Sequence, residues 1–304
     1  MITLLNLLAL ALAKATPLFL ACVGGLLSEV GGVINFALEG MMLTGAFVAV
    51  WATYVSGSPL IGLLAGAGGG MGIGLIHAVA SLGFKANQIV SSIAVNLLSL
   101  GVTGMLLNQI FSVYGTSPTV PGLPDLGGAM AALLSMSEGH FPAPIARLSI
   151  MVVATILIAA LLPFFINHTT WGLRLRACGE NPLAAKAAGL AVGRIRFLAV
   201  LIGGAFAGMG GAYISIGELS QFVEHMTQGR GYLAIAALIL GRWRPIGIIA
   251  SCLLFGLSES LSEWFSVRLP GLPYQLFLAL PYVICLIVLM IHLSRGRPPS
   301  ALGR

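Results

Sequence analysis

Charged residues are scarce in this chain of 304 residues. Lysine, arginine, aspartate and glutamate together make up only 8% of it, while 58% of the residues are hydrophobic. Soluble domains average about 25% charged residues, so this composition cannot cover a surface that faces water. The sequence therefore predicts a protein whose outer surface faces lipid, and in which each membrane-spanning helix needs about 20 mostly apolar residues.

The residue patterns of metal, nucleotide and catalytic sites are also missing. The four cysteines lie far apart, the five histidines are scattered, and no C-x-x-C or H-E-x-x-H pattern occurs, so we expect no metal site. No G-x-x-x-x-G-K-[ST] loop is present, so we expect no nucleotide or other cofactor on this chain. No nucleophile has a base at a suitable spacing, so no catalytic residue is expected. Basic residues do not form a stripe with aromatics, which argues against a nucleic-acid partner.

Long apolar runs dominate what is present. They predict an all-α, polytopic bundle of about 8–10 membrane spans that forms a single domain over residues 1–304. The first run contains Lys14 and Pro17, so it is either one kinked span or an interfacial helix followed by a shorter span. The seventh run is too short to cross a membrane alone and is either a half-helix or a strongly irregular segment. The runs cover residues 4–28, 33–55, 60–82, 88–111, 147–166, 195–216, 230–241, 246–263 and 274–293.

Basic residues gather in a few loops and predict the orientation, because cytoplasmic loops are enriched in lysine and arginine. The loop 171–196 and the C-terminal tail hold most of them, and Lys85, Arg242 and Arg244 complete the set. We expect all of these on the cytoplasmic side, together with the C-terminus. Residues 112–146, which are poor in lysine and arginine, then form an extracytoplasmic loop.

Glycine recurs every four residues at Gly62, Gly66, Gly70 and Gly74. This spacing places four glycines on one helix face, where another backbone can approach closely. We expect that face to pack against helices of the same subunit.

Polar residues inside the apolar runs are candidates for function, because polar groups in a membrane are costly and usually functional. Asn35 and Glu39 are four residues apart and share a helix face, either as part of a gate or as a structural cap. Five polar residues line one face of the run 88–111, which we expect to turn inward, towards a solute path or towards neighbouring helices. With Asn35 and Glu39 they are the candidate path residues: Gln88, Ser92, Asn96, Ser99 and Thr103.

A short helix is predicted inside the basic loop 171–196. Asn181 is a favourable N-cap, Pro182 suits the first helical position, and Gly189 suits the C-terminal end. A helix this short cannot span the membrane. It is either a docking surface for a cytoplasmic partner or a helical linker.

At this loop the sequence resembles the permeases of ABC importers for branched-chain amino acids, simple sugars and nucleosides. GENPLAAKAAGL is similar to the coupling helix of that superfamily, and INFALEGMMLTGAF is similar to its N-x-x-x-E-G-M-M motif. ANQIVSSIAVNLLSLGVTG and GRGYLAIAALILGRWRPIG match further stretches, and the resemblance covers residues 16–292. It implies that the ATPase-coupling residues are Glu180, Asn181, Pro182, Ala185 and Gly189.

The resemblance also implies an assembly in a bacterial inner membrane. ATPase subunits that hold ATP and Mg²⁺ would dock at the coupling helix, a second permease would complete the path, and an extracytoplasmic binding protein would deliver a nucleoside or simple sugar. The second permease could be a longer, different chain or another copy of this one. A branched-chain amino acid permease and a self-contained secondary transporter are the alternatives, although no paired inverted repeats favour the latter.

Overall fold

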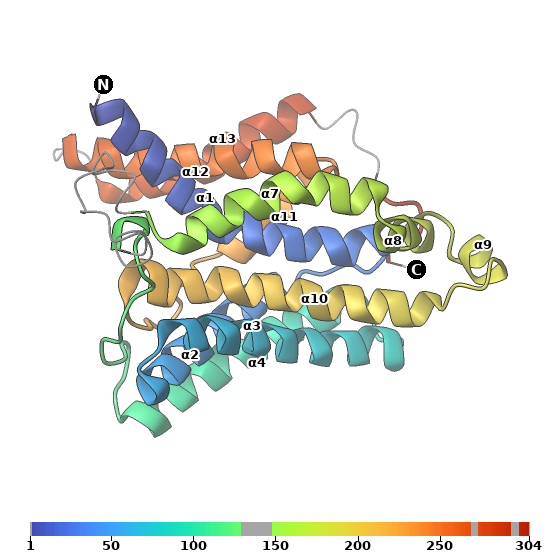
Figure 1. Cartoon of the computed structure of the whole chain (residues 1–304), viewed down its shortest axis with the longest axis horizontal. Helices are drawn as coiled ribbons and strands as arrows, with labels where there is room; N and C mark the ends of the chain where they lie inside the picture. Colours follow the sequence, from blue (N-terminus) through green and yellow to red (C-terminus); the bar gives the residue numbers. More distant parts are fainter. Residues whose placement is uncertain (1, 129–147, 269–272, 293–297, 304) are drawn as a thin grey trace.

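The helices of this chain form an elongated bundle in a computed structural model that describes residues 2–128, 148–268, 273–292 and 298–303. Over these residues the chain is helical, with two isolated β-bridges and no longer strand. Most helices run along the long axis of the bundle (Figure 1). Their bounds are α1 Ile2–Val30, α2 Leu38–Ser56, α3 Pro59–Ala78, the π-helix η1 Val79–Gly83, α4 Gln88–Phe111, α7 Ile150–His168, α8 Thr170–Glu180, α9 Pro182–Ala187, α10 Val192–Ala212, the π-helix η3 Tyr213–Leu219, α11 Arg230–Leu240, α12 Pro245–Arg268 and α13 Tyr274–His292.

Seven helices in the described part of the chain are long and apolar enough to cross a membrane. Two shorter apolar helices are α11 and the part of α13 at Gln275–Val288. Each apolar run of the sequence thus contains a helix, which confirms the polytopic helical bundle and the short seventh run. The first run is one continuous helix that contains Pro17.

The second apolar run differs from the prediction. We expected a span over 33–55, but α2 begins only at Leu38, and residues 31–37 are not helical. Val33, Asn35 and Ala37 are nevertheless buried. The chain therefore enters the interior of the bundle in a non-helical form, with turns at residues 31–32 and 36–37, before α2 starts.

The predicted glycine face lies inside the subunit, between α3 and the neighbouring α2 and α10. A Cβ on Gly66 would lie 2.8 Å from the Cβ of Ala212, and a Cβ on Gly70 would lie 2.6 Å from the Cα of Gly208. The three backbones are therefore in direct contact, as expected for glycine-rich helix packing in membranes.

The two ends of the bundle differ in charge. The end that carries α8, α9 and the C-terminus holds the basic loop residues, and the N-terminus lies at the opposite end (Figure 1). The described part of the loop 112–146 lies at the N-terminal end, where the amide of Ser117 donates to the carbonyl of Phe222 at 2.9 Å. Residues 129–147 of that loop are outside the described residues. The end with α8 and α9 is called the basic end below.

Candidate functional site: a broken helix and a half-helix inside the bundle

In the non-helical segment 31–37 the amides of residues 31–33 donate to carbonyls at the end of α1, but the amides of Ile34 and Phe36 have no helical partner. In a membrane interior such groups need partners within the protein, because no water is available to them. The partners are side chains of the polar face of α4. The amide of Ile34 donates to Gln88 Oε1 at 2.7 Å and the amide of Phe36 donates to Ser92 Oγ at 3.2 Å. The polar face of α4 is therefore turned inward, towards a backbone.

Asn96 makes the densest set of these contacts. Its Oδ1 accepts from the amide of Gly40 at 2.8 Å, and its Nδ2 donates to the carbonyl of Phe36 at 2.8 Å and to the hydroxyl of Tyr232 at 3.1 Å. One side chain thus joins α4, the start of α2 and the start of α11.

The last two residues of the polar face behave differently. Thr103 donates to the carbonyl of Ser99 within its own helix, and in the described part of the chain the Ser99 hydroxyl has no hydrogen-bond partner. Thr103 also lines a cavity of about 180 Å³ with Glu224 and His225. The role of the stripe in a solute path stays a prediction, but Gln88, Ser92 and Asn96 have a structural task in this conformation.

Glu39 lies in the first turn of α2 and faces the start of α11. Its Oε1 accepts from the Thr227 hydroxyl at 2.6 Å and from the Gly229 amide at 2.9 Å, and its Oε2 accepts from the Gly231 amide at 2.7 Å. Free N–H groups and the positive end of the dipole at a helix N-terminus favour a carboxylate. Of the two interpretations that the sequence left open, the geometry supports the cap.

Glycine is needed where the two elements meet. A Cβ on Gly231 would lie 2.5 Å from the Cα of Glu39 and 2.8 Å from its Oε2. Asn35 turns away from this junction: its Nδ2 donates to Ser28 Oγ at 3.0 Å and its Oδ1 accepts from the Ala37 amide at 3.2 Å. Asn35 therefore fixes the non-helical segment 31–37, while Glu39 fixes the short helix α11.

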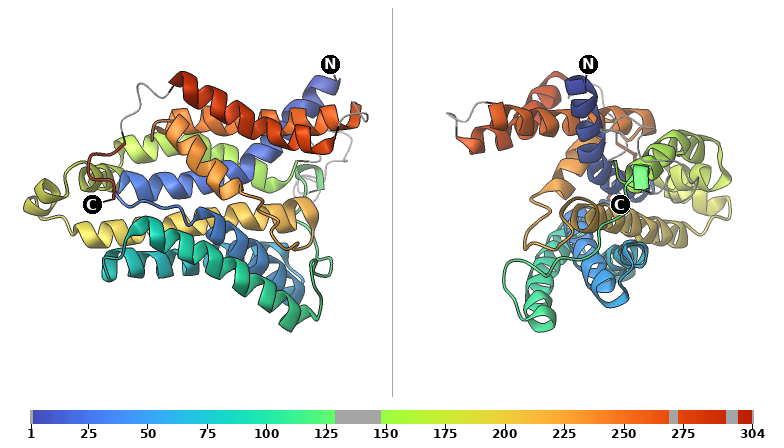
Figure 2. Two further views of the ribbon diagram at one scale, coloured as in Figure 1. Left: turned by 180° about the vertical axis from the view of Figure 1, so that it is seen from behind. Right: turned by 60° about the vertical axis from the view of Figure 1, so that its left-hand side comes forward.

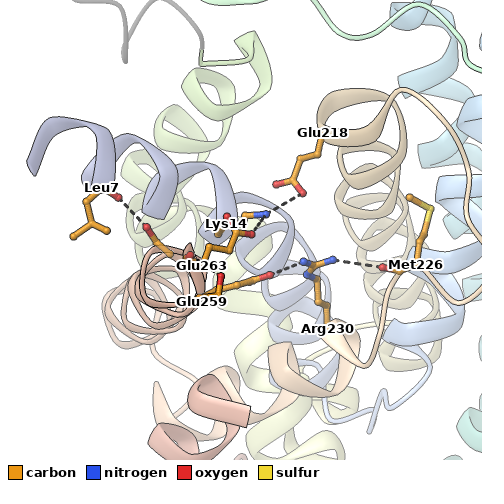
Figure 3. A network of polar contacts seen from close by, with 9 residues as sticks. Leu7, Lys14, Glu218, Met226, Arg230, Glu259 and Glu263 are labelled. Atoms are coloured by element: carbon orange, nitrogen blue, oxygen red, sulfur yellow. Dashed lines mark hydrogen bonds and ion pairs between the residues drawn. The ribbon is translucent and has the colours of Figure 1, made fainter. Parts of the chain in front are cut away.

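A second polar cluster, which we call the charge cluster, contains Lys14, Glu218, Arg230, Glu259 and Glu263 (Figure 3). Lys14 Nζ lies 2.8 Å from Glu263 Oε1 and 3.8 Å from Glu218 Oε2, and Arg230 pairs with Glu259. The cluster joins α1, η3, α11 and α12. The sequence patterns did not predict this cluster. The available signal was Lys14 itself, because a cation in an apolar run needs an acidic partner.

The short helix of the basic loop is present as predicted. Asn181 Oδ1 accepts from the Ala184 amide at 3.0 Å, Pro182 is the first helical residue, and Gly189 has a φ of +82° just after the helix. Ala185 is buried against the protein, whereas the side chain of Leu183 is 80% exposed. The helix thus presents an apolar side chain to its surroundings.

The C-terminal tail packs against the base of this loop, which the sequence did not indicate. Ser300 Oγ donates to Glu180 Oε2 at 2.9 Å, and the Ala301 amide donates to the carbonyl of Gly179 at 2.9 Å. The Gly303 amide donates to the carbonyl of Gly32 at 3.1 Å. Glu180 therefore takes part in a contact between α8, the tail and the non-helical segment 31–37.

No group of histidine, cysteine or acidic side chains suited to a metal ion occurs in the described residues. Cys22, Cys178, Cys252 and Cys285 are buried free thiols. What the described chain offers is a hydrogen-bonded interior next to a broken helix, and a short exposed helix at the basic end.

Comparison with known proteins identifies the family of this chain. The chain matches the family described as "Branched-chain amino acid transport system / permease component" over residues 7–291. It is 34% identical to the guanosine ABC transporter permease protein NupQ of Bacillus subtilis, and also 34% identical to the nucleoside ABC transporter permease protein NupC of Lactococcus lactis. Each alignment covers 96% of this chain and 93% of the relative. The putative glucose permease TsgC13 of Haloferax volcanii is 34% identical over 81% of this chain and 74% of its own length.

The same two bacteria each provide a second, less similar permease, NupP at 29% identity and NupB at 24%. No solved structure matches the chain. The family match spans nearly the whole bundle, from α1 to α13. The chain therefore belongs to the branched-chain amino acid transport permease family, and it is a multi-pass membrane permease subunit of an ABC transporter.

Proposed function

We propose that this permease carries nucleosides into a bacterial cell across the inner membrane. The observation that supports this solute is the near full-length similarity to NupQ and NupC, whose names give guanosine and nucleosides. A simple sugar is the second candidate, supported by the shorter match to TsgC13. A branched-chain amino acid would need charged contacts for its ammonium and carboxylate groups, which the neutral face of α4 does not offer.

The solute path is proposed along the face where α4, α11 and α13 lie (Figure 2, left). Tyr232, in the first turn of α11, and Tyr282, whose hydroxyl donates to the carbonyl of Gln228 just before α11, are 50% and 44% exposed there. Half-exposed aromatic rings next to hydrogen-bonding groups suit a base or sugar ring. A second permease on this face would complete the path, and the pairs NupP with NupQ and NupB with NupC favour a different chain over a second copy.

A transport assay tests the solute. Cells that lack their own nucleoside importers and express this chain with its partner subunits are expected to take up labelled guanosine. An excess of unlabelled nucleosides should abolish the uptake, and an excess of glucose or leucine should not. Cells with an inactive partner ATPase are the control and should show no uptake. Uptake of glucose or leucine instead of guanosine would overturn the assignment.

The basic end is proposed to face the cytoplasm, where α9 docks into an ATPase subunit that binds ATP and Mg²⁺. Leu183 on α9 is the apolar side chain offered to the partner, and Asn181 and Gly189 hold the two ends of that helix. Glu180 and Ala185 fix its base to the permease. The opposite end, with the N-terminus and residues 112–128, would receive the binding protein.

Replacing Leu183 by aspartate is expected to reduce the amount of ATPase that co-purifies with the permease by about tenfold or more, because a buried apolar anchor contributes about 2 kcal/mol to an interface. Gly189→Val should act in the same direction, since a β-branched residue is strained at a φ of +82°. Tyr114→Asp is the matched control, because Tyr114 is 83% exposed at the opposite end. Full ATPase recovery with both α9 variants would show that α9 is only a linker.

A further inference from the structure

A cavity of about 920 Å³ opens at the basic end of the bundle. It lies between the ends of α7 and α8 on one side and the start of α12 on the other, and its volume is near the upper limit of about 1,000 Å³ for small-molecule sites. Glu180 and Pro299 reach its wall from α8 and the tail. The solute path proposed above uses a different face, so this cavity has no assigned role.

Three arginines line the cavity: Arg176, Arg242 and Arg244. Among the described residues none of them forms an ion pair. Arg176 donates to the carbonyl of Asn167 at 3.4 Å, and its buried Nε has no hydrogen-bond partner in the described part of the chain. The one acidic residue of the wall, Glu180, accepts from Ser300. The wall therefore carries an excess of positive charge.

The turn between α11 and α12 places two of these arginines. Arg242 and Trp243 have φ values of 56° and 54°, a left-handed conformation that is uncommon for residues other than glycine. Trp243 is fixed by its indole N–H, which donates to Glu29 at 2.6 Å, so Glu29 is occupied. The first residues of α12 also line the cavity. Pro245 has no N–H and the Ile248 amide donates to the carbonyl of Arg244, which leaves the amides of Ile246 and Gly247 at this helix N-terminus. The arginines and these amides favour an anion.

Apart from Asn167 and Ser251, the rest of the wall is mostly apolar and continues along the helices, away from the arginines. Ala250 and Leu254 are one and two turns further into α12 than the first cavity residues of that helix. Val288 of α13 and Ile166 of α7 face the same space. The cavity therefore combines a basic mouth with an apolar wall that leads towards the membrane interior.

We propose that this cavity binds an anionic phospholipid of the leaflet at the basic end. The three arginines and the α12 N-terminus would hold the phosphate and the anionic headgroup, and the apolar wall would take the first part of an acyl chain. The charges of the three arginines exceed the single negative charge of Glu180, and a zwitterionic lipid has no net charge to balance this excess. A free anion would not contact the apolar wall. Basic pockets between transmembrane helices on the cytoplasmic side are suited to anionic headgroups.

Native mass spectrometry of the full-length chain with phosphatidylglycerol or phosphatidylcholine tests the proposal. We expect bound phosphatidylglycerol and little phosphatidylcholine. The double variant R242Q/R244Q should bind phosphatidylglycerol about 30-fold more weakly, because each arginine near an anionic membrane surface contributes about fivefold to the affinity. Arg174→Gln is the matched control, since Arg174 is on the same helix as Arg176 but lies outside the cavity wall. Arg176→Gln replaces the double variant if the latter does not give monodisperse protein.

Two further measurements separate the possible occupants. Ala250→Trp fills the space beside the apolar wall without changing a charge, so this variant should bind the lipid more weakly. Glycerol 3-phosphate, the probe for a free anion, should not raise the melting temperature of the wild-type chain. Equal binding of phosphatidylglycerol by the arginine variants and the wild type would overturn the proposal. Stabilisation by glycerol 3-phosphate that Ala250→Trp leaves intact would show a site for free anions. Displacement of the lipid by the ATPase subunit would assign the cavity to that partner.

Discussion

Replacing Gly70 by leucine is expected to prevent the chain from folding into a monodisperse protein. The added Cβ alone would lie 2.6 Å from the Cα of Gly208 and closer still to the carbonyl of Gly204. Both are backbone atoms, so no change of rotamer relieves the clash. Overpacking in a core costs about 1–3 kcal/mol when side chains can adjust, and here α3 and α10 would have to separate.

Gly72→Leu is the control for this prediction. Gly72 is on the same helix and is exposed, and a Cβ there meets no atom within 4 Å. Leucine also favours a helix over glycine by about 1 kcal/mol, so this variant should be as stable as the wild type or more so. The Gly70→Leu and Gly72→Leu variants are solubilised and compared by size-exclusion chromatography and by their melting temperatures. Equal yields and melting temperatures would show that α3 and α10 are not packed backbone to backbone.

Glu39→Gln is expected to loosen α11 and to lower the stability of the whole protein. The carboxylate accepts three hydrogen bonds, from Thr227, Gly229 and Gly231. A glutamine has one acceptor oxygen, and its amide N–H₂ would face donors. At least one buried N–H then loses its partner, at a cost of about 1–3 kcal/mol. The favourable interaction between the charge and the helix dipole, about 0.3–1 kcal/mol, is lost as well.

Hydrogen–deuterium exchange detects this change locally. In the Glu39→Gln variant the amides at the start of α11 should exchange faster, while those of α7 keep the wild-type rate. Glu224→Gln is the matched control: it makes the same chemical change in the loop that precedes α11, at a carboxylate that lines the 180 Å³ cavity and does not cap this helix. If exchange in α11 is the same in both variants, Glu39 does not cap this helix and the gating interpretation gains support.

The sequence was informative about features that depend on local patterns. Runs of apolar residues located the helices, the shortness of residues 230–241 indicated a half-helix, and Asn181, Pro182 and Gly189 marked the ends of α9. Each of these depends on residues that are neighbours in the sequence or share a helix face. A single sequence is sufficient to read such patterns.

The contacts of the candidate site inside the bundle could not be predicted from local patterns in the sequence. Residues 31–37 include Val33 and Phe36 and look like the start of a span, because nothing in an apolar run distinguishes a non-helical backbone from a helix. The polar face of α4 was expected to turn inward, but its partner is a backbone, which has no sequence signature. Glu39 and Gly231 are separated by 192 positions, so only the folded chain shows that they meet.

The contacts of the tail have a consequence for biosynthesis. The amides of Ala301 and Gly303 donate to the carbonyls of Gly179 and Gly32. Ala301 and Gly303 emerge from the ribosome after every helix that has been described. The base of α8 and the non-helical segment 31–37 therefore gain these contacts only when synthesis has passed residue 303. A nascent chain that stalls earlier would lack both hydrogen bonds at the basic end.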